Sequence, residues 1–377
     1  MESFCVRRAV ERLREGLFDP VAVKRLTVEE DKIKNVFSQG IKALERGTSG
    51  HLCICGSYGQ GKSHTIAYLN QFALSQGYAT SVVQLDLREA PFYRFSAVYR
   101  SIMERLCLPD GKRFTQAWKS WAEKNSLEIL DSMPHRFKMV LKAMLCKNKR
   151  LSSKESSQKK HQAYRPKEYG DWLEQAWIGH DIPIASLKSA FKYREVEGYR
   201  EHSLICRENS EYVQLVRSLG KLLHQMGYKG LLLFFDEAES ITQGRLRHRA
   251  KSYAILDQLF RSNGFVYSVF AFTDDFFHQV NHELYDENGE IFPKNYGEAW
   301  RDLTVLRLQD FSSHGWESLL DRLIELYSQA YRVDLSTEVK KGLHSFLGKL
   351  EIQETRFKLK ALVNRLDVAT QQALLNP

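Results

Sequence analysis

Hydrophobic and polar residues follow two periods along the chain, which predict strands and helices in turn. Short stretches rich in apolar or β-branched residues, typical of buried strands, occur at 52–55, 80–87, 231–235, 265–272 and 303–308. Apolar residues at helical spacing occupy 5–15, about 27–44, 65–73 and 95–106. A capping box, Thr27-x-x-Glu30, marks the start of the second helix. This alternation favours an α/β fold, with a parallel sheet flanked by helices.

The stretch from His51 to Leu69 places a glycine loop between a strand and a helix. The loop fits G-x-x-x-x-G-K-[ST], and glycines let backbone N–H groups point at phosphate oxygens in front of the positive end of the next helix. Lys62 supplies a charge for the β- and γ-phosphates, and Ser63 a hydroxyl for Mg²⁺. Because both flanks are correct, a P-loop is favoured over a chance match in a glycine-rich turn. The predicted nucleotide-binding residues are Gly56, Ser57, Tyr58, Gly59, Gln60, Gly61, Lys62, Ser63 and His64.

Polar residues end two of the later strands. The apolar run 231–235 leads into Asp236 and Glu237, and the run 265–272 leads into Thr273. In a parallel α/β sheet, ligands bind at the carboxyl ends of the strands. Asp236 would hold Mg²⁺ through Ser63 and water, and Glu237 would orient and deprotonate the attacking water. The upstream P-loop favours this interpretation over a buried strand that merely ends in two acids. The sequence therefore predicts ATP and Mg²⁺ as cofactors.

The alternation pauses in the middle of the chain. Helical spacing prevails over about 108–228, except at 147–167, where Ser, Lys and Gln predict a solvated loop. Three amphipathic helices close the chain at about 313–330, 336–349 and 355–374. We therefore predict an N-terminal helical segment (1–50) packing on the nucleotide site, a P-loop core (51–311) containing the helical insertion, and a C-terminal helical lid (312–377).

Composition narrows the class of protein. The 377 residues, 43% of them apolar, suffice for a buried core without disulfides or metal. The start MESFCVRR lacks the apolar core of a signal peptide, and no apolar run reaches the roughly 18 residues of a membrane span. The six cysteines are scattered, without a C-x-x-C pair. We therefore expect a cytoplasmic protein with reduced thiols and no membrane contact.

Positive charge is concentrated in few places. The net charge is +9, and the segment Lys147–Lys167 alone carries eight Lys or Arg and one Glu. A second basic stretch, Arg245–Lys251, is either an extended loop or a helix that is basic on two sides. Each stretch is either an ordinary solvated surface or a contact for the phosphate backbone of DNA. The sequence leaves this choice open.

Three groups of side chains have two interpretations each. Four tryptophans of the insertion either stack on unpaired bases or form its core, and their apolar neighbours at helical spacing favour the core. These are Trp118, Trp121, Trp172 and Trp177. Leu26, Val28 and Ile33 either form a pocket over the adenine or pack as ordinary helix residues. His278 and His282 fit a surface helix better than a metal site, because no third ligand has diagnostic spacing.

These features together resemble the AAA+ P-loop ATPases, and within them the ATP-binding proteins of bacterial BREX phage-defence systems. The stretches at 91–94 and 227–239 are more specific than the P-loop, which many families share. The stretches that carry the resemblance are Arg7-Arg-Ala-Val-Glu-Arg-Leu-Arg-x-Gly16, Gly56-Ser-Tyr-Gly-x-Gly-Lys-Ser-His64, Pro91-Phe-Tyr-Arg94, Gly227-Tyr-Lys-Gly-Leu-Leu-Leu-Phe-Phe-Asp-Glu-Ala-Glu239 and Arg356-Phe-x-Leu-Lys-x-Leu-Val-x-x-Leu-Asp367.

The resemblance implies further roles and partners. Thr273 would be the sensor-1 residue, Arg356 would reach the nucleotide from the lid as sensor 2, and Arg301 would complete a neighbouring subunit's site, which implies a homo-oligomer. The family is also similar to origin-recognition and helicase-loader ATPases, so DNA, a helicase or another defence-system protein are the implied partners. Loaders carry a winged-helix domain after the lid, and this sequence stops at Pro377. DNA contact would therefore come from the two basic stretches or from a partner.

Two functions from different classes follow. The first is an ATP-hydrolysing AAA+-like protein that oligomerises and acts on DNA or with a DNA-processing partner in anti-phage defence. The second is a nucleotide-gated scaffold that binds ATP with little turnover and signals through the position of its lid. A kinase would also use the P-loop, but the acidic pair Asp236-Glu237 and the long insertion fit it poorly.

Overall fold

The structure is a computed structural model that describes residues 2–17, 19–28, 30–48, 50–146, 166–261, 264–283, 291–352 and 354–375. Most of the predicted basic loop at 147–167 therefore lies outside the described residues. Within the described residues, no helix is long and apolar enough to cross a membrane.

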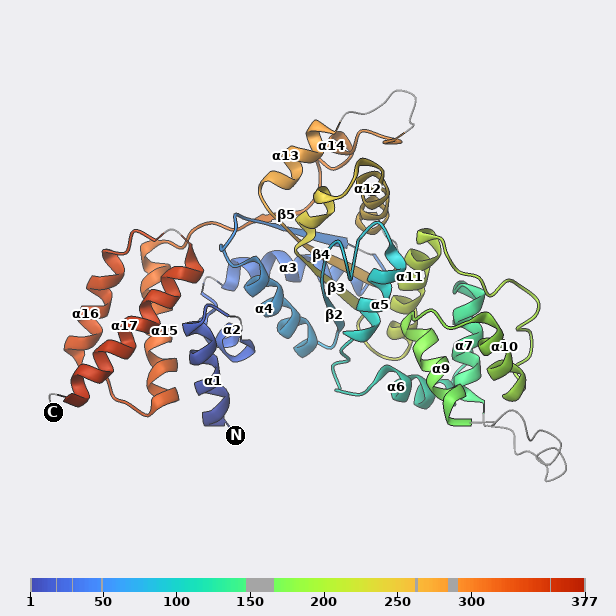
Figure 1. The fold of residues 1–377 in the computed structure, drawn as a ribbon, viewed down its shortest axis with the longest axis horizontal. Coiled ribbons are helices and arrows are strands. Elements are labelled where there is room, and N and C mark those ends of the chain that lie inside the picture. The colour runs from blue at the N-terminus through green and yellow to red at the C-terminus, as the bar shows by residue number, and fades with distance from the viewer. Residues whose placement is uncertain are drawn as a thin grey trace.

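In the described part of the chain, five parallel strands form the central sheet (Figure 1). They are β1 (Gly50–Cys55), β2 (Ala79–Gln84), β3 (Leu231–Asp236), β4 (Val266–Phe272) and β5 (Val305–Arg307). Their order across the sheet is β2-β3-β4-β1-β5, and each neighbouring pair is parallel. This confirms the predicted α/β class. It also places β4 between the P-loop strand β1 and the strand β3 that ends in Asp236.

The edge strand β2 ends three residues before the predicted limit of Leu87. The reason is a turn built on the side chain of Asp86. Its Oδ1 accepts hydrogen bonds from the backbone N–H groups of Arg88 (2.5 Å) and Glu89 (2.6 Å). A carboxylate that binds backbone amides two and three residues ahead favours a turn over an extended strand.

Helices cover both faces of the sheet, because successive strand residues point to opposite faces. The helices on one face are α3 (Glu30–Leu44) and α4 (Lys62–Ser75), and those on the other are α5 (Phe95–Glu104), α11 (Asn209–Gln225) and α12 (Leu246–Phe260). Helix α11 approaches the sheet closely at Gly220. A Cβ there would lie 2.6 Å from Val266 Cγ2 and 2.8 Å from Phe265 O, so only glycine permits this packing.

The helical insertion forms its own extension of the core beside β2. Its described elements before α11 are α6 (Phe114–Ala122), η1 (Glu128–Ser132), α7 (His135–Leu145), α9 (Pro166–Ile178) and α10 (Ile184–Tyr193). Trp118 and Trp177 are fully buried, and Trp121 and Trp172 pack against the same cluster. The core interpretation of the four tryptophans is therefore confirmed. Short elements complete the chain between β3 and β5: η2 (Ala238–Gln243), α13 (Asp275–His282) and α14 (Tyr296–Ala299).

The first and last helices of the chain share one hydrophobic core. The helices α1 (Glu2–Arg14) and α2 (Pro20–Leu26) pack with α15 (Ser313–Tyr331), α16 (Thr337–Gly348) and α17 (Thr355–Leu375). Val10 of α1, Leu320 of α15 and Leu366 of α17 are all fully buried in this cluster. Figure 1 shows the five helices side by side at one end of the sheet, with the insertion at the other. We call this group the lid body.

The predicted capping box at Thr27 is wrong, because α3 begins only at Glu30. Thr27 Oγ1 donates to Val23 O (2.7 Å) and lies 2.9 Å from His64 Nε2. The Glu30 carboxylate accepts from Lys34 Nζ (2.7 Å) instead of capping Thr27. The Thr27 hydroxyl thus joins the end of α2 to the P-loop helix, a tertiary contact that local sequence spacing does not reveal.

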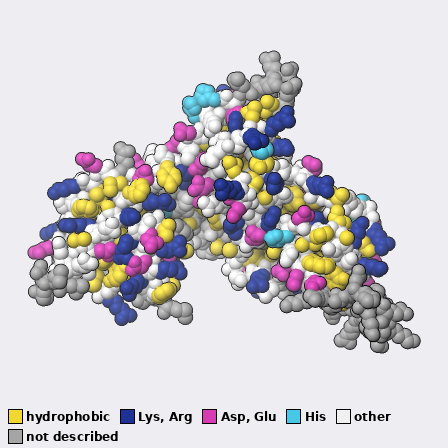
Figure 2. Space-filling view, viewed as in Figure 1, with side chains coloured by type: hydrophobic (Ala, Val, Ile, Leu, Met, Phe, Trp, Pro, Cys, Tyr) yellow, Lys and Arg dark blue, Asp and Glu magenta, His cyan; other side chains and the backbone are white. Residues whose placement is uncertain are grey.

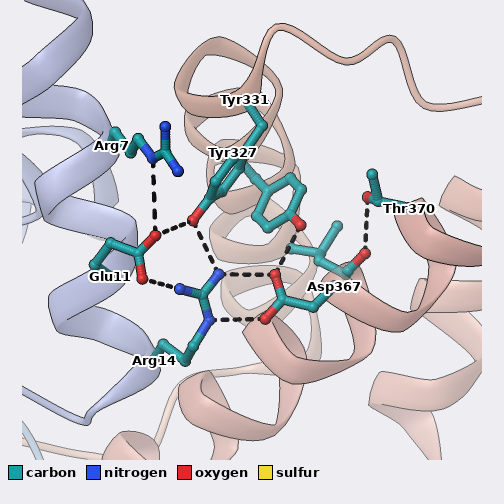
Figure 3. Close-up of polar contacts among 8 residues, drawn as sticks. Arg7, Glu11, Arg14, Tyr327, Tyr331, Asp367 and Thr370 are labelled. Carbon is teal, nitrogen blue, oxygen red and sulfur yellow. Dashed lines mark hydrogen bonds and ion pairs between the residues drawn. The ribbon is translucent and has the colours of Figure 1, made fainter.

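An ion-pair network fastens α1 to the lid helices (Figure 3). Arg14 donates from Nε to Asp367 Oδ2 and from Nη2 to Asp367 Oδ1, both at 2.8 Å. Tyr327 OH also donates to Asp367 (2.7 Å), and Tyr331 OH donates to Glu11 (2.6 Å). Burial alone raises the pKa of Asp367, but the bonds from Arg14 and Tyr327 outweigh it and hold that pKa below its usual value.

Replacing Asp367 by Asn should lower the free energy of unfolding at neutral pH by about 2 kcal/mol, because it leaves Arg14 half-buried without its carboxylate. The native pKa of Asp367 is depressed, so its contribution is fully present above the pKa of about 3.9 in the unfolded chain. The difference between the proteins should therefore shrink as pH falls below about 4. Urea unfolding at several pH values measures it. Asp334→Asn, at an exposed position, is the control. Equal losses of unfolding free energy in both variants would contradict a stabilising role of the Arg14–Asp367 ion pair.

Candidate functional site

The P-loop has the geometry that an anion requires. Gly59 and Gly61 have φ of 82° and 93°, a left-handed region that favours glycine. Gly56 is tightly packed, since a Cβ there would lie 2.9 Å from Gln60 Oε1 and 3.2 Å from Leu308 Cβ. The helix α4 begins at Lys62 with no side-chain cap and no acidic residue in its first turn. Its first N–H groups and its positive end are thus available to phosphate oxygens.

Lys62 lies buried across this loop. Its Nζ donates to Gly56 O (2.8 Å) and Ser57 O (3.2 Å), and the residue is 9% exposed. Among the described residues, no carboxylate lies within ion-pair distance of this ammonium. A buried charge held only by neutral carbonyls gains from an anionic partner. A phosphate at the loop is such a partner, so the residues present fit a bound nucleotide.

The acidic pair lies where β3 ends at the pocket. Glu237 has φ 57° and ψ 33°, a left-handed conformation that costs about 1–2 kcal/mol for a residue with a side chain. Its backbone N–H donates to Asp236 Oδ1 (3.0 Å). Backbone strain of this kind is found at functional positions, where surrounding structure holds it. The sequence predicted the acidic pair, but not this backbone.

Glu239 is a third carboxylate at the site, and it was not among the residues predicted from the sequence. It lines the same pocket, and its Oε2 is buried without a hydrogen-bond partner among the described residues. Burial raises the pKa of Glu239, and the charges of Asp236 and Glu237 add to the rise while Lys62 opposes it. Its role could have been suspected from its position, three residues after Asp236 in the short 3-10 helix η2.

One pocket gathers the P-loop, the acidic residues and the lid body. From the P-loop and β3 it is lined by 58–65 and by Asp236, Glu237 and Glu239. From the lid it is lined by Arg356, next to Gly16 of the α1–α2 link, where an added Cβ would lie 3.5 Å from Arg356 Cγ. The apolar residues Leu26, Val28 and Ile33 line it too. Their predicted contact with adenine stays a prediction.

The predicted residues Thr273 and Arg301 lie outside this pocket lining. Thr273 is half-buried and directly follows β4, between the ends of β1 and β3. Arg301 is mostly exposed, pairs with Glu298 (3.8 Å) and lines a separate hollow. The neighbouring Arg307, which the sequence analysis missed, lines both hollows.

Side-chain contacts tie the P-loop and the start of α4 to distant segments. Ser57 Oγ donates to Asp274 Oδ2 (3.0 Å), at the end of β4. His64 Nε2 lies 2.9 Å from Thr27 Oγ1, at the end of α2. Burial lowers the pKa of His64 to about 4, so the ring is neutral at pH 7. The second contact connects the first turn of α4 directly to the link between lid body and sheet.

The second basic stretch forms the start of a helix, since α12 spans Leu246–Phe260. Of the two predicted conformations, extended loop and helix, the structure shows the helix. Arg249 is already paired with Glu283, with Nε 2.6 Å from Oε1. His248 stacks on Tyr93, with ring centroids 3.8 Å apart. Part of this basic stretch is therefore engaged within the protein.

Comparison with known proteins gives a match to a family model and a similarity to solved structures. No curated protein matches the chain. Among solved structures, the chain is similar to the Walker-type ATPase PABY2304 of Pyrococcus abyssi, at 12% identity and a TM-score of 0.39, over 92% of this chain and 74% of that one. The family model of the BREX system ATP-binding protein BrxC/D matches residues 5–131 and 205–377. Both the P-loop and the Asp236-Glu237 strand lie within these ranges, and the chain therefore belongs to this family of ATP-binding P-loop proteins.

Proposed function

We propose that the chain is an Mg²⁺-dependent AAA+-like ATPase that acts on DNA, or with a DNA-processing partner, in anti-phage defence. The observation that carries the proposal is the single pocket that joins Lys62 of the P-loop to Asp236 and Glu237. Phosphate-binding groups and a carboxylate suited to activate water thus line the same pocket. This combination favours hydrolysis over binding alone.

Each residue has a distinct task in this proposal. The first N–H groups of α4 and the Lys62 ammonium would bind the β- and γ-phosphates and stabilise the charge that develops on them. Glu237 would orient the attacking water and accept its proton. Ser63 and Asp236 would hold Mg²⁺, which supplies charge neutralisation on the phosphate oxygens when bound. Thr273, at the end of β4, would polarise the water or the γ-phosphate.

The lid and a neighbouring subunit would complete the site. Arg356 lines the pocket and would contact the γ-phosphate from the lid. Arg301 is mostly exposed and outside its own subunit's pocket, which suits a role in the site of a neighbouring copy. In such a homo-oligomer, turnover per chain rises with protein concentration.

DNA engagement is supported by charge and by family. The chain has a net charge of +9, and the segment Lys147–Lys167 contributes most of it. The family match is to a protein of the BREX system. A helicase or another protein of the same system would be an alternative recipient of the hydrolysis energy.

A nucleotide-gated switch is the second candidate, and one observation favours it. The lid body and the sheet both line the pocket, and the Thr27–His64 contact joins them at its edge. A ligand that contacts two bodies can set their relative position without being hydrolysed. Such a switch would bind ATP and turn it over slowly.

Steady-state ATP hydrolysis with and without DNA tests the proposal. We expect Mg²⁺-dependent phosphate release that rises when DNA is added, because DNA would favour the closed lid and the assembled oligomer. Phosphate release measured over a range of protein concentrations also tests the contribution of Arg301. Tight ATP binding without turnover, with or without DNA, would exclude the ATPase and leave the switch.

A further inference from the structure

A further hollow, of 630 Å³, opens in the helical insertion. One wall is α10, and the other is the segment 199–205 that follows it. In Figure 1 this part of the insertion lies at the opposite end of the molecule from the lid body. The hollow is therefore separate from the nucleotide pocket. Its volume is in the range of 300–1,000 Å³ that is usual for ligand sites.

Positive side chains face this hollow from both walls. Lys188 and Lys192 lie four residues apart on α10, about 6 Å along one face of the helix. Arg200 contributes from the opposite wall, which the His202 ring also lines, and no carboxylate is part of the lining. Within the described part of the chain, neither lysine nor Arg200 has an acidic side chain at ion-pair distance. Uncompensated like charges around one hollow attract an anion.

The positive charge is confined to the lining of the hollow, because acidic residues occur close by in the sequence. Glu195, Glu197 and Glu201 lie on the same connecting segment, and Glu201 is close to Gly198, where a Cβ would lie 3.4 Å from its carboxylate. None of the three lines the hollow. The lining of the hollow therefore carries cationic side chains and no acidic one.

The rest of the lining offers a hydrogen-bond donor and a stacking surface. Ser203 Oγ accepts from the backbone N–H of Ile205 (3.1 Å), which leaves its own O–H for a phosphate oxygen. Arg200 Nε donates to Tyr199 OH (3.1 Å), and its guanidinium carbon lies 5.3 Å from the centre of that ring. Ile205 beside them is 49% exposed. Cations next to planar and apolar surfaces are typical of sites for nucleic-acid strands.

The position of α10 in the sequence supports a ligand that is specific to the helical insertion. The family match is interrupted from 132 to 204, and α10 lies within that interval. Helix α10 packs against α7 and α9, between which the sequence carries the basic segment Lys147–Lys167. Figure 2 shows Lys and Arg side chains beside hydrophobic ones on the outer surface of this end.

We propose that this hollow binds the phosphodiester backbone of a nucleic-acid strand through Lys188, Lys192 and Arg200. The inference deepens the proposed function, because it names the site through which nucleic acid would be engaged, and it rests on that function for its role. A strand is favoured over an acidic peptide because it offers both repeated charges for the cations and bases for the Arg200–Tyr199 surface.

Fluorescence anisotropy of dye-labelled oligonucleotides with the full chain tests the proposal. Single strands and duplexes of equal length form two arms, each titrated over a range of salt concentrations. In the double variant Lys188→Ala/Lys192→Ala, we expect the affinity for single strands to fall at least about 10-fold near 0.1 M salt. The slope of log K against log salt should flatten by about 1.4, from two lost phosphate contacts. The charge-retaining Lys188→Arg/Lys192→Arg should bind like the wild type.

The double variant Lys340→Ala/Lys341→Ala is the matched control, because it removes two exposed lysines from the lid helix α16. Thermal unfolding and ATP binding establish that each variant is folded. If the wild type binds oligonucleotides and the Lys188/Lys192 variant binds them equally well, the site is wrong and the proposed DNA engagement stands. If the wild type binds no oligonucleotide, both the proposed site and the proposed DNA engagement fail. If the Lys188/Lys192 variant lost binding only to a labelled phosphopeptide and kept its binding to oligonucleotides, the ligand would be a peptide and the proposal would be overturned.

Discussion

Replacing Glu237 by Gln is expected to lower the rate of ATP hydrolysis by about 10²–10⁴-fold while ATP binding survives. Gln has nearly the shape of Glu and can still orient a water, but it cannot accept the proton. The left-handed backbone at this position is the same in both proteins, so the substitution adds no new strain. Single-turnover phosphate release measures the chemical step, and equilibrium titration with a fluorescent ATP analogue measures binding.

Glu338→Gln is the matched control for this experiment. Glu338 is exposed in the first turn of α16, so the same chemical change there should leave hydrolysis unaffected. A Glu237→Gln protein that retains the wild-type rate would exclude Glu237 as the base. Glu239 would then be the candidate base, because it lines the same pocket and its Oε2 is buried without a hydrogen-bond partner among the described residues.

Replacing Lys62 by Ala is expected to weaken ATP binding by at least about 100-fold, since it removes charge-assisted hydrogen bonds to the phosphates. The change also leaves the carbonyl groups of Gly56 and Ser57 without the donor that holds them. Isothermal titration calorimetry with ATP measures the loss. Circular dichroism, recorded on the same sample, establishes that the loss does not come from unfolding.

Lys341→Ala, on an exposed face of α16, is the control for Lys62→Ala. Lys62→Arg is also informative, because it keeps the charge but places a larger, planar group in a buried position. We expect it to bind ATP more weakly than the wild type. Unchanged affinity in Lys62→Ala would mean that the loop at 56–63 does not hold the phosphates.

The sheet and the P-loop could be predicted because their signals are local. A strand buried on both faces is a continuous apolar run, and the positions of Gly56, Lys62 and Ser63 are set by one turn of backbone around an anion. The acidic end of β3 follows from the same reasoning. The three helices of the lid were also predicted within a few residues, because each has an apolar stripe at helical spacing.

The contacts that join distant segments could not be predicted in this way. Thr27 matched a capping box, but its hydroxyl bonds to Val23 O and lies beside His64, 37 residues further along the chain. The apolar stripe of α1 indicated a helix but not its partner, which is the lid core. Local spacing determines which face of a helix is apolar, whereas tertiary packing determines what covers that face.

The order of synthesis gives the lid body a particular folding problem. Arg14 and its partner Asp367 are separated by 353 residues, and the apolar faces of α1 and α2 are covered by helices that are made much later. Contacts so distant in sequence form late, because the intervening chain must first be closed into a loop. The α/β sheet can therefore fold while α1 and α2 still expose hydrophobic surface. Until α17 leaves the ribosome, the apolar faces of these first helices are open to chaperones and to aggregation.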